Sequence, residues 1–85
     1  MPKARTYNAD ADRFGAIIRS LREQKGWTLT KLATRAGMNA TYVSIVEAGG
    51  NVPSLSTVLE LLEVLGADTS AVMGQLAEAR QRPKS

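Results

Sequence analysis

The chain contains neither cysteine nor histidine. These absences exclude disulfide bonds, thiolate nucleophiles and imidazole bases, and they remove most of the ligands that a transition metal uses in proteins. The serine, threonine, lysine and carboxylate side chains that remain form no recognisable catalytic arrangement. We therefore expect a protein that is not an enzyme, with no catalytic residue, no metal site and no cofactor.

Long hydrophobic runs are also missing. No apolar stretch approaches the roughly 20 residues that span a bilayer, and Asn8, Asp10 and Asp12 stand where a signal peptide would have its apolar segment. The chain is therefore expected to avoid membranes and to be cytoplasmic. Its 85 residues are enough for one small domain and too few for two.

Charge is distributed unevenly along the chain. Residues 1–50 carry eight Lys and Arg against four Asp and Glu, a net +4, whereas residues 51–79 carry four acids and no base, a net −4. Three basic residues after position 79 bring the total to +3. Because each phosphate that a protein neutralises releases condensed counterions, the basic first half favours a polyanion as partner. A merely solvated basic surface would have the same composition.

Apolar spacing and turn residues predict an all-α protein, a compact bundle of five helices without strands. Asp10 or Asp12 is expected to cap the first helix, and Gly26 to end it. Together, the five helices are expected to span about residues 10–25, 29–36, 40–48, 54–65 and 70–80. Residues 10–80 would then form the domain, between a flexible arm of residues 1–9 and a disordered tail of residues 81–85.

The apolar stripe of each helix predicts the face that it buries. In the first four helices the stripes are Phe14, Ile17, Ile18 and Leu21; Leu29, Leu32, Ala33 and Ala36; Val43 and Val46; and Leu55, Val58, Leu59, Leu62 and Leu65. Leu61 and Val64 lie outside the stripe of the fourth helix. That helix is therefore expected to be apolar on a second face.

The second and third helices carry the pattern that points to function. A turn of about four residues, 37–40, joins them and is too short for an antiparallel hairpin with matched apolar faces. The two helices are therefore expected to cross at a steep angle, with Ala33 small enough to let the third helix pass close. Since Val43 and Val46 anchor this helix inward, its opposite face should protrude and fit a DNA major groove, about 12 Å wide.

From about Phe14 to Gly66 the chain resembles the phage repressor and Cro-type (XRE-like) helix-turn-helix regulators, whose fold is the lambda-repressor-like DNA-binding domain. The matching segments are Leu21-Arg22 before Gly26-Trp27-Thr28, Leu32-Ala33 with Gly37, Tyr42-Val43-Ser44, Glu47, and Pro53-Ser54-Leu55-Ser56-Thr57. The resemblance implies sequence-specific binding of double-stranded DNA by a transcriptional repressor or autoregulatory controller, with residues 40–48 in the major groove. Small stand-alone members, such as the controller proteins of restriction–modification systems, have the same plan.

Specific DNA contacts are also implied by the resemblance. Base edges would be read by Ala40, Thr41 and Ser44, with Ile45 at their margin, although Ile45 could equally pack or lie in a dimer interface. Many relatives bind a phosphate through a Gln at the position of Leu29, and this chain departs from them there. The candidates for phosphate contacts are Thr28, Thr30, Lys31, Arg35, Asn39, Tyr42, Asn51, Ser54 and Ser56. Each of these could instead be a helix cap, a solvated charge or, for Tyr42, a cover over apolar surface.

Arg22 and Glu47 are implied to form a partly buried ion pair between the first helix and the recognition helix. Arginine can bind a carboxylate through two hydrogen bonds, and a lone buried charge would be costly. The expected role of the pair is structural.

A homodimer is expected because one recognition helix reads only about four base pairs, too few for useful specificity. A two-fold axis would place two such helices on a palindromic operator, roughly 34 Å apart. The expected interface is the apolar surface of the last two helices, formed by Leu61, Val64, Val72, Met73 and Leu76. The fifth helix could instead merely cover the core. No small-molecule effector is expected, since no room remains for an effector domain.

Two rival functions remain open on the sequence alone. The first is an antitoxin that binds a toxin protein as well as its operator, and the second is a protein-interaction module on the same fold. Lys3 and Arg5 could reach a minor groove or be solvated charges. A DNA-bound regulator would be associated with the nucleoid.

Overall fold

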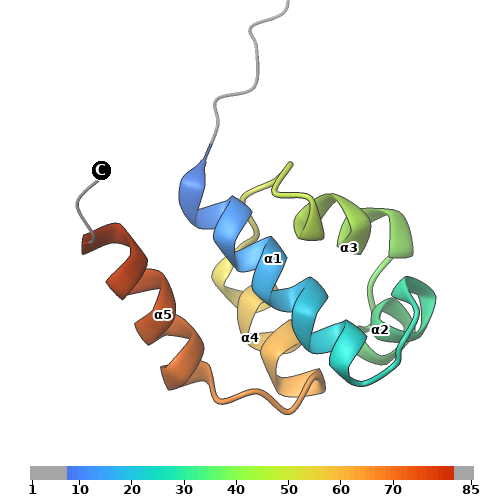
Figure 1. Cartoon of the computed structure of the whole chain (residues 1–85). Coiled ribbons are helices and arrows are strands. Elements are labelled where there is room, and N and C mark those ends of the chain that lie inside the picture. The colour runs from blue at the N-terminus through green and yellow to red at the C-terminus, as the bar shows by residue number, and fades with distance from the viewer. Residues whose placement is uncertain (1–7, 82–85) are drawn as a thin grey trace, which may run out of the picture.

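The computed structural model describes residues 8–81. Over these residues it contains no strand and five helices (Figure 1), which are α1 (Ala9–Gln24), α2 (Leu29–Ala36), α3 (Ala40–Glu47), α4 (Leu55–Val64) and α5 (Thr69–Gln81). The expected all-α, five-helix architecture is confirmed. None of these helices is both long enough and apolar enough to cross a membrane.

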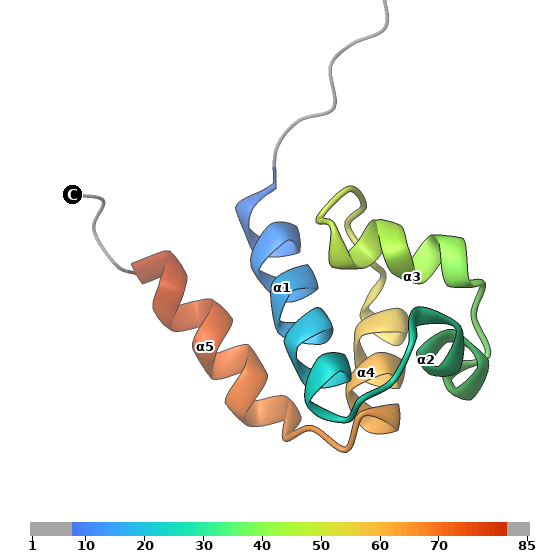
Figure 2. The same ribbon diagram turned by 45° about the vertical axis from the view of Figure 1, so that its right-hand side comes forward.

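Each helix packs against two others. Helix α1 packs against α3 and α5, while α2 packs against both α3 and α4. Figures 1 and 2 show α5 on one side of α1 and the pair α2 and α3 on the other. The arrangement places α3 at an edge of the molecule, with α1 and α2 supporting its inner side.

The N-terminal boundary of the first helix differs from the expected one. The Asn8 side chain accepts a hydrogen bond of 2.9 Å from the Ala11 backbone N–H, so the helix begins at Ala9 rather than at Asp10 or Asp12. Asp10 instead lies within the first turn, where its carboxylate pairs with Arg80 of α5 at 3.5 Å. Asn8 and Ala9, which were expected to belong to the N-terminal arm, are therefore the cap and the first residue of α1.

The C-terminal helix is also slightly longer than expected. Asp68 caps it through a hydrogen bond of 3.1 Å from the Ala71 backbone N–H, and the helix continues to Gln81. Residues 1–7, with Lys3 and Arg5, and residues 82–85 lie outside the described part of the chain.

The core contains the central members of the stripes predicted for the first three helices. Its largest fully buried side chains are Ile18, Leu32, Val43, Val46, Leu61 and Leu62. Phe14, Ala33 and Ala36 join them in the core. The outer members of these stripes, Ile17, Leu21 and Leu29, are partly buried against it.

The inward face predicted for the fourth helix is partly wrong. Leu55 is 73% exposed and Leu59 is 45% exposed, whereas Leu61, expected on the outer face, is fully buried. Both arrangements satisfy a helical period, because Val58, Leu61, Leu62 and Leu65 also follow the i, i+3, i+4, i+7 spacing. In a helix this rich in aliphatic residues, packing against the other helices selects which stripe is buried.

Two residues of the expected dimer interface are likewise not on the surface. Leu61 is fully buried and Val72 is only 4% exposed, so both belong to the core. Met73, in contrast, is 36% exposed, and Val64 and Leu76 are partly buried. The exposed large apolar side chains of this region are instead Val52, Leu55 and Leu59 of the segment around α4 and Met73 of α5. Of these, Val52, Leu55 and Met73 line one groove.

Candidate nucleic-acid interface

A sharp corner between α2 and α3 is built by local signals. The Thr28 hydroxyl caps α2 by accepting a hydrogen bond of 3.0 Å from the Lys31 backbone N–H. The helix ends at Gly37, whose φ of +68° is the left-handed conformation that glycine adopts without strain. The Met38 backbone N–H then bonds to the Ala33 carbonyl at 2.8 Å and closes the turn.

The third helix begins at once after this turn. The Asn39 side-chain oxygen accepts hydrogen bonds from the backbone N–H groups of Thr41 at 2.7 Å and Tyr42 at 3.3 Å. On the inner side of α3, Val43 and Val46 are fully buried. The orientation of the helix is therefore set by a cap at its start and by two anchors along its inner face.

The outer side of α3 is exposed, as its spacing predicts. Thr41 and Ser44 are exposed, and Ile45 is 40% exposed. Ala40 and Tyr42 are partly buried and pack against the core. Two hydroxyls and an aliphatic side chain thus share a protruding surface on one short helix, while the Tyr42 ring covers apolar surface.

The phosphate-contact candidates fall into separate groups in the sequence. Thr28, Thr30, Lys31 and Arg35 belong to α2 and its cap; Asn39 and Tyr42 to the start of α3; and Asn51, Ser54 and Ser56 to the loop and first turn of α4. All of them except Tyr42 are exposed. In three of these residues, Thr28, Asn39 and Ser54, the side-chain oxygen caps a helix.

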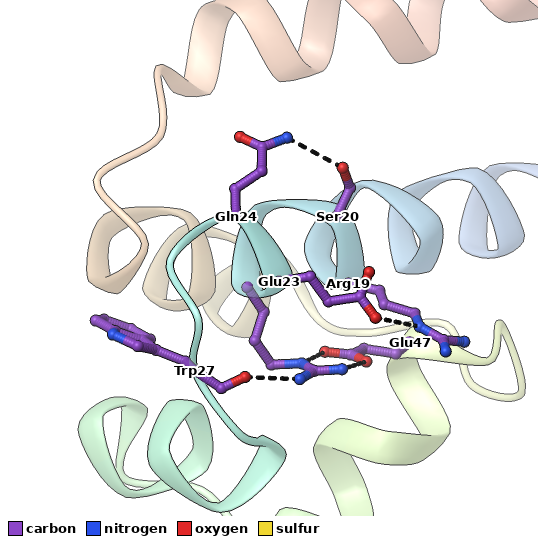
Figure 3. A network of polar contacts seen from close by, with 7 residues as sticks. Arg19, Ser20, Glu23, Gln24, Trp27 and Glu47 are labelled. Carbon is purple, nitrogen blue, oxygen red and sulfur yellow. Dashed lines mark hydrogen bonds and ion pairs between the residues drawn. The ribbon is translucent and has the colours of Figure 1, made fainter.

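Arg22 and Glu47 form the ion pair that the family resemblance implies (Figure 3). The Arg22 guanidinium donates from Nε to one carboxylate oxygen at 2.7 Å and from Nη2 to the other at 3.1 Å. Its Nη1 donates to the Trp27 carbonyl at 2.8 Å. The side chains of Arg22 and Glu47 are only 12% and 6% exposed, so the pair is largely shielded from water.

The same contacts control the charge of the guanidinium. The hydrogen bond to the Glu47 carboxylate raises the pKa of Arg22 above its ordinary value and outweighs the opposing effect of burial. Arg22 therefore remains protonated and joins three segments of the chain, namely α1, the turn before α2 and the end of α3.

Residues 13–73 match the model of a helix-turn-helix domain family. The chain belongs to the helix-turn-helix family. A 10 kDa protein of the ImmF control region of Bacillus phage phi105 is 30% identical over 63 residues, which are 74% of this chain and 70% of that protein.

A mycobacterial relative covers less of its own length. An uncharacterized HTH-type transcriptional regulator of Mycobacterium tuberculosis is 40% identical over 52 residues, 61% of this chain. The chain spans only about a fifth of the length of that regulator, since the match covers 20% of it.

Solved structures have the same helix-turn-helix fold. The restriction–modification controller protein C.AhdI from Aeromonas hydrophila is 34% identical, with a TM-score of 0.72, over 76% of this chain and 98% of that one. The controller protein C.Esp1396I, solved as a tetramer in complex with its natural 35 base-pair operator, has a TM-score of 0.75 at 18% identity over 84% of this chain and 93% of that one. This second likeness concerns the fold alone.

Gly15 of α1 has a structural role that the sequence did not lead us to predict. A Cβ on Gly15 of α1 would collide with the Val46 carbonyl oxygen and would lie 2.6 Å from the Glu47 carbonyl oxygen. The missing side chain therefore lets α1 approach the backbone of α3. A signal was available, because glycine inside a helix is unfavourable and usually has a packing reason.

Proposed function

We propose that this chain binds double-stranded DNA sequence-specifically as a transcriptional regulator, with α3 in the major groove. The observation that carries the proposal is the exposed outer face of α3, held rigidly by two buried valines and by the Arg22–Glu47 pair. A helix of this size fits a groove about 12 Å wide. Family membership supports the proposal, since the relatives are regulators, a non-enzymatic class.

Base reading is assigned to the outer face of α3. The hydroxyls of Thr41 and Ser44 can donate to or accept from base edges, and the Thr41 methyl and Ile45 suit the thymine methyl group. Ala40 lies at the start of the helix with its small side chain partly buried. Because these contacts are few and permissive, DNA shape should contribute to specificity as well.

The position of the protein on the duplex is assigned to phosphate contacts made by residues outside the outer face of α3. Lys31 and Arg35 offer exposed charges from α2. Exposed polar side chains are offered by Thr30, Asn51 and Ser56. The side-chain oxygens of Thr28, Asn39 and Ser54 are occupied in capping helices, so these positions would contribute through the backbone N–H groups of the first helical turn that follows each of them. The Tyr42 hydroxyl could reach a phosphate while its ring covers the core.

The protein is further proposed to act as a homodimer on a palindromic operator. Val52, Leu55 and Leu59 are 64%, 73% and 45% exposed, an unusual amount of aliphatic surface on one small domain. Val52 and Leu55 also line an open groove of about 290 Å³, together with Phe14 of α1 and with Met73 and Leu76 of α5. A two-fold axis through this surface would cover it with the same surface of a second copy.

The cellular setting follows from the proposed activity. A regulator of transcription acts where the chromosome lies, so we place the protein in the cytoplasm and at the nucleoid when it is bound to DNA. The apolar surface around Leu55 also fits the alternative of an antitoxin, in which a toxin protein would cover it. Purification from the native cell separates these cases, because a second small protein that co-purifies with the chain supports the antitoxin, and its absence supports the regulator.

Selection of bound duplexes from a random pool tests the function directly. The expected result is a palindromic sequence whose half-sites are centred about ten base pairs apart, one helical turn of DNA. Recovery of unrelated sequences with no shared motif would contradict specific binding. A single, non-repeated half-site would contradict the dimer while leaving DNA binding intact.

A further inference from the structure

Trp27, in the connection between α1 and α2, is surrounded by three cations. Lys25 Nζ lies 5.2 Å from the centroid of its ring, Lys31 Nζ lies 5.4 Å away, and Arg35 Cζ lies 5.0 Å away. These distances are within the range of cation–π attraction, about 6 Å. We call these four residues the Trp27 cluster.

The charges of the Trp27 cluster are not balanced by carboxylates. Within residues 8–81 the ion pairs join Asp10, Glu23 and Glu47 to other arginines, and none involves Lys25, Lys31 or Arg35. The first turn of α2, which contains Lys31, has no acidic residue. Three like charges gathered around one ring repel each other, and an anion bound between them would remove this repulsion.

The Trp27 cluster also has a fixed position relative to the recognition helix. The Trp27 carbonyl accepts a hydrogen bond of 2.8 Å from Arg22 Nη1, and the same guanidinium holds Glu47 at the end of α3 (Figure 3). In addition, α2 packs directly against α3. The cluster is therefore connected to the proposed base-reading helix by rigid contacts on two sides.

We propose that the Trp27 cluster is a clamp for the DNA backbone, which binds successive phosphates of the strand bordering the groove that α3 occupies. This inference rests on the proposed function and adds Lys25 and Trp27 to the contact surface. In helix-turn-helix complexes the first helix of the motif crosses the backbone, and here that helix is α2. One strand of DNA carries a negative charge every 3.4 Å of its axis, so a dense group of three cations suits it better than an isolated cation does.

Trp27 acts in this clamp as a positioning residue. Free lysine and arginine side chains lose rotamer freedom when they bind a phosphate. Contact with the indole ring restricts the three side chains before DNA arrives, which lowers the entropy lost on binding. Since the ring has no charge, its removal should weaken binding without removing any phosphate contact.

The charge test uses the triple variant Lys25→Gln, Lys31→Gln, Arg35→Gln. Its dissociation constants for the selected operator and for a scrambled duplex are measured from 50 to 200 mM salt. Both are expected to rise by the same factor, about tenfold or more at 50 mM, and the log–log salt slope to fall by about 0.9 for each lost phosphate contact. The matched control is Arg19→Gln, which removes one exposed charge of α1 that pairs with Glu23 at 3.2 Å.

The positioning test uses the ring. Trp27→Leu keeps all three charges and is expected to weaken operator binding severalfold with the salt slope unchanged, while Trp27→Phe restores most of the affinity. A merely structural role of the ring would lower the melting temperature of Trp27→Leu without lowering the affinity of the folded fraction. Circular dichroism at the binding temperature distinguishes these two results.

The outcomes separate this inference from the proposed function. Suppose that the parent binds its operator, and that the triple variant binds each duplex as tightly as the parent does and with the same salt slope. The clamp is then wrong, and the proposed regulatory function is unaffected. If that variant instead loses only its retention on poly-glutamate, the cluster serves an acidic protein partner, which also overturns the DNA assignment. A parent that binds no duplex would end the proposed function and the clamp together.

Discussion

Arg22 and Glu47 are 25 residues apart in the sequence, and the guanidinium of the first donates two hydrogen bonds, of 2.7 and 3.1 Å, to the two carboxylate oxygens of the second. Because the pair links α1 to the last residue of α3, it helps to hold the C-terminal end of α3 in place. The third bond of the guanidinium, to the Trp27 carbonyl, extends the same connection to the start of α2. One arginine thus joins α1 to the end of α3 and to the turn that leads into α2.

Breaking this ion pair should destabilise the fold more than removing it altogether. Arg22→Met or Glu47→Leu alone is expected to lower the free energy of unfolding by about 3–5 kcal/mol, because each leaves a desolvated charge without its partner. The double variant should lose less stability than either single variant, because it leaves no charge unpaired. Urea unfolding of the four proteins gives the coupling, and strictly additive losses would contradict it.

Titration of Arg22 should not change the stability that the ion pair provides near neutral pH. The pKa of Arg22 is raised in the folded state, chiefly by its bond to Glu47. A raised pKa gives stability that is complete below the pKa of the unfolded chain and is lost only as the pH rises through the folded value. For arginine both values lie far above neutral pH, so Arg22→Met should lower the stability equally at pH 6 and pH 8.

Two helical glycines provide a matched test of the contact between α1 and α3. Gly15→Ala is expected to cost about 1–3 kcal/mol through overpacking, because its Cβ would meet backbone of α3 that cannot turn aside. Gly74→Ala has nothing within 4 Å of the new Cβ and should stabilise the protein by about 0.5–1 kcal/mol through helix propensity. Thermal unfolding of both variants checks the prediction, and equal effects would refute the close approach at Gly15.

The two faces of α4 can be distinguished by truncation. Leu61→Ala is expected to lower the unfolding free energy by about 2–5 kcal/mol, because this fully buried side chain would leave a cavity. Leu55→Ala, at a position that is 73% exposed, should change monomer stability by no more than about 0.5 kcal/mol. Sedimentation should instead show weaker self-association for Leu55→Ala, and an undiminished dimer would move the interface elsewhere.

Substitution of the exposed hydroxyls of α3 should alter specificity rather than stability. Thr41→Ala and Ser44→Ala are each expected to reduce the discrimination between operator and mismatched duplexes by about 1–3 kcal/mol. Their melting temperatures should match the parent, because both side chains are exposed. Ser70→Ala, at an exposed serine of α5, is the control and should leave the discrimination unchanged.

Operator binding should depend steeply on salt. If a dimer neutralises six to ten phosphates, its affinity should fall by about 10³-fold to 10⁵-fold between 50 and 200 mM salt. Fluorescence anisotropy of a labelled operator measures this slope. A flat response would argue against contact with the DNA backbone.

Local signals explain why so much of the motif is predictable from the sequence. Thr28 and Asn39 cap their helices, and Gly37 ends α2 with a positive φ, all through contacts within a few residues. Val43 and Val46 are spaced at a helical period, so their burial can be predicted from the sequence. Arg22 and Glu47 could be paired only because the order of these elements resembles a known family.

The five helices, the corner between the second and third, and the exposed face of the third follow from local sequence, because each depends on residues that are neighbours along the chain. The tertiary structure alone decided which face of α4 enters the core, since two stripes satisfy the same period and only packing distinguishes Leu61 from Leu55. It also decided that Gly15 touches the backbone of α3 and that three cations surround Trp27. These contacts join residues on different helices or on either side of a turn, and their distances depend on how the helices pack in space.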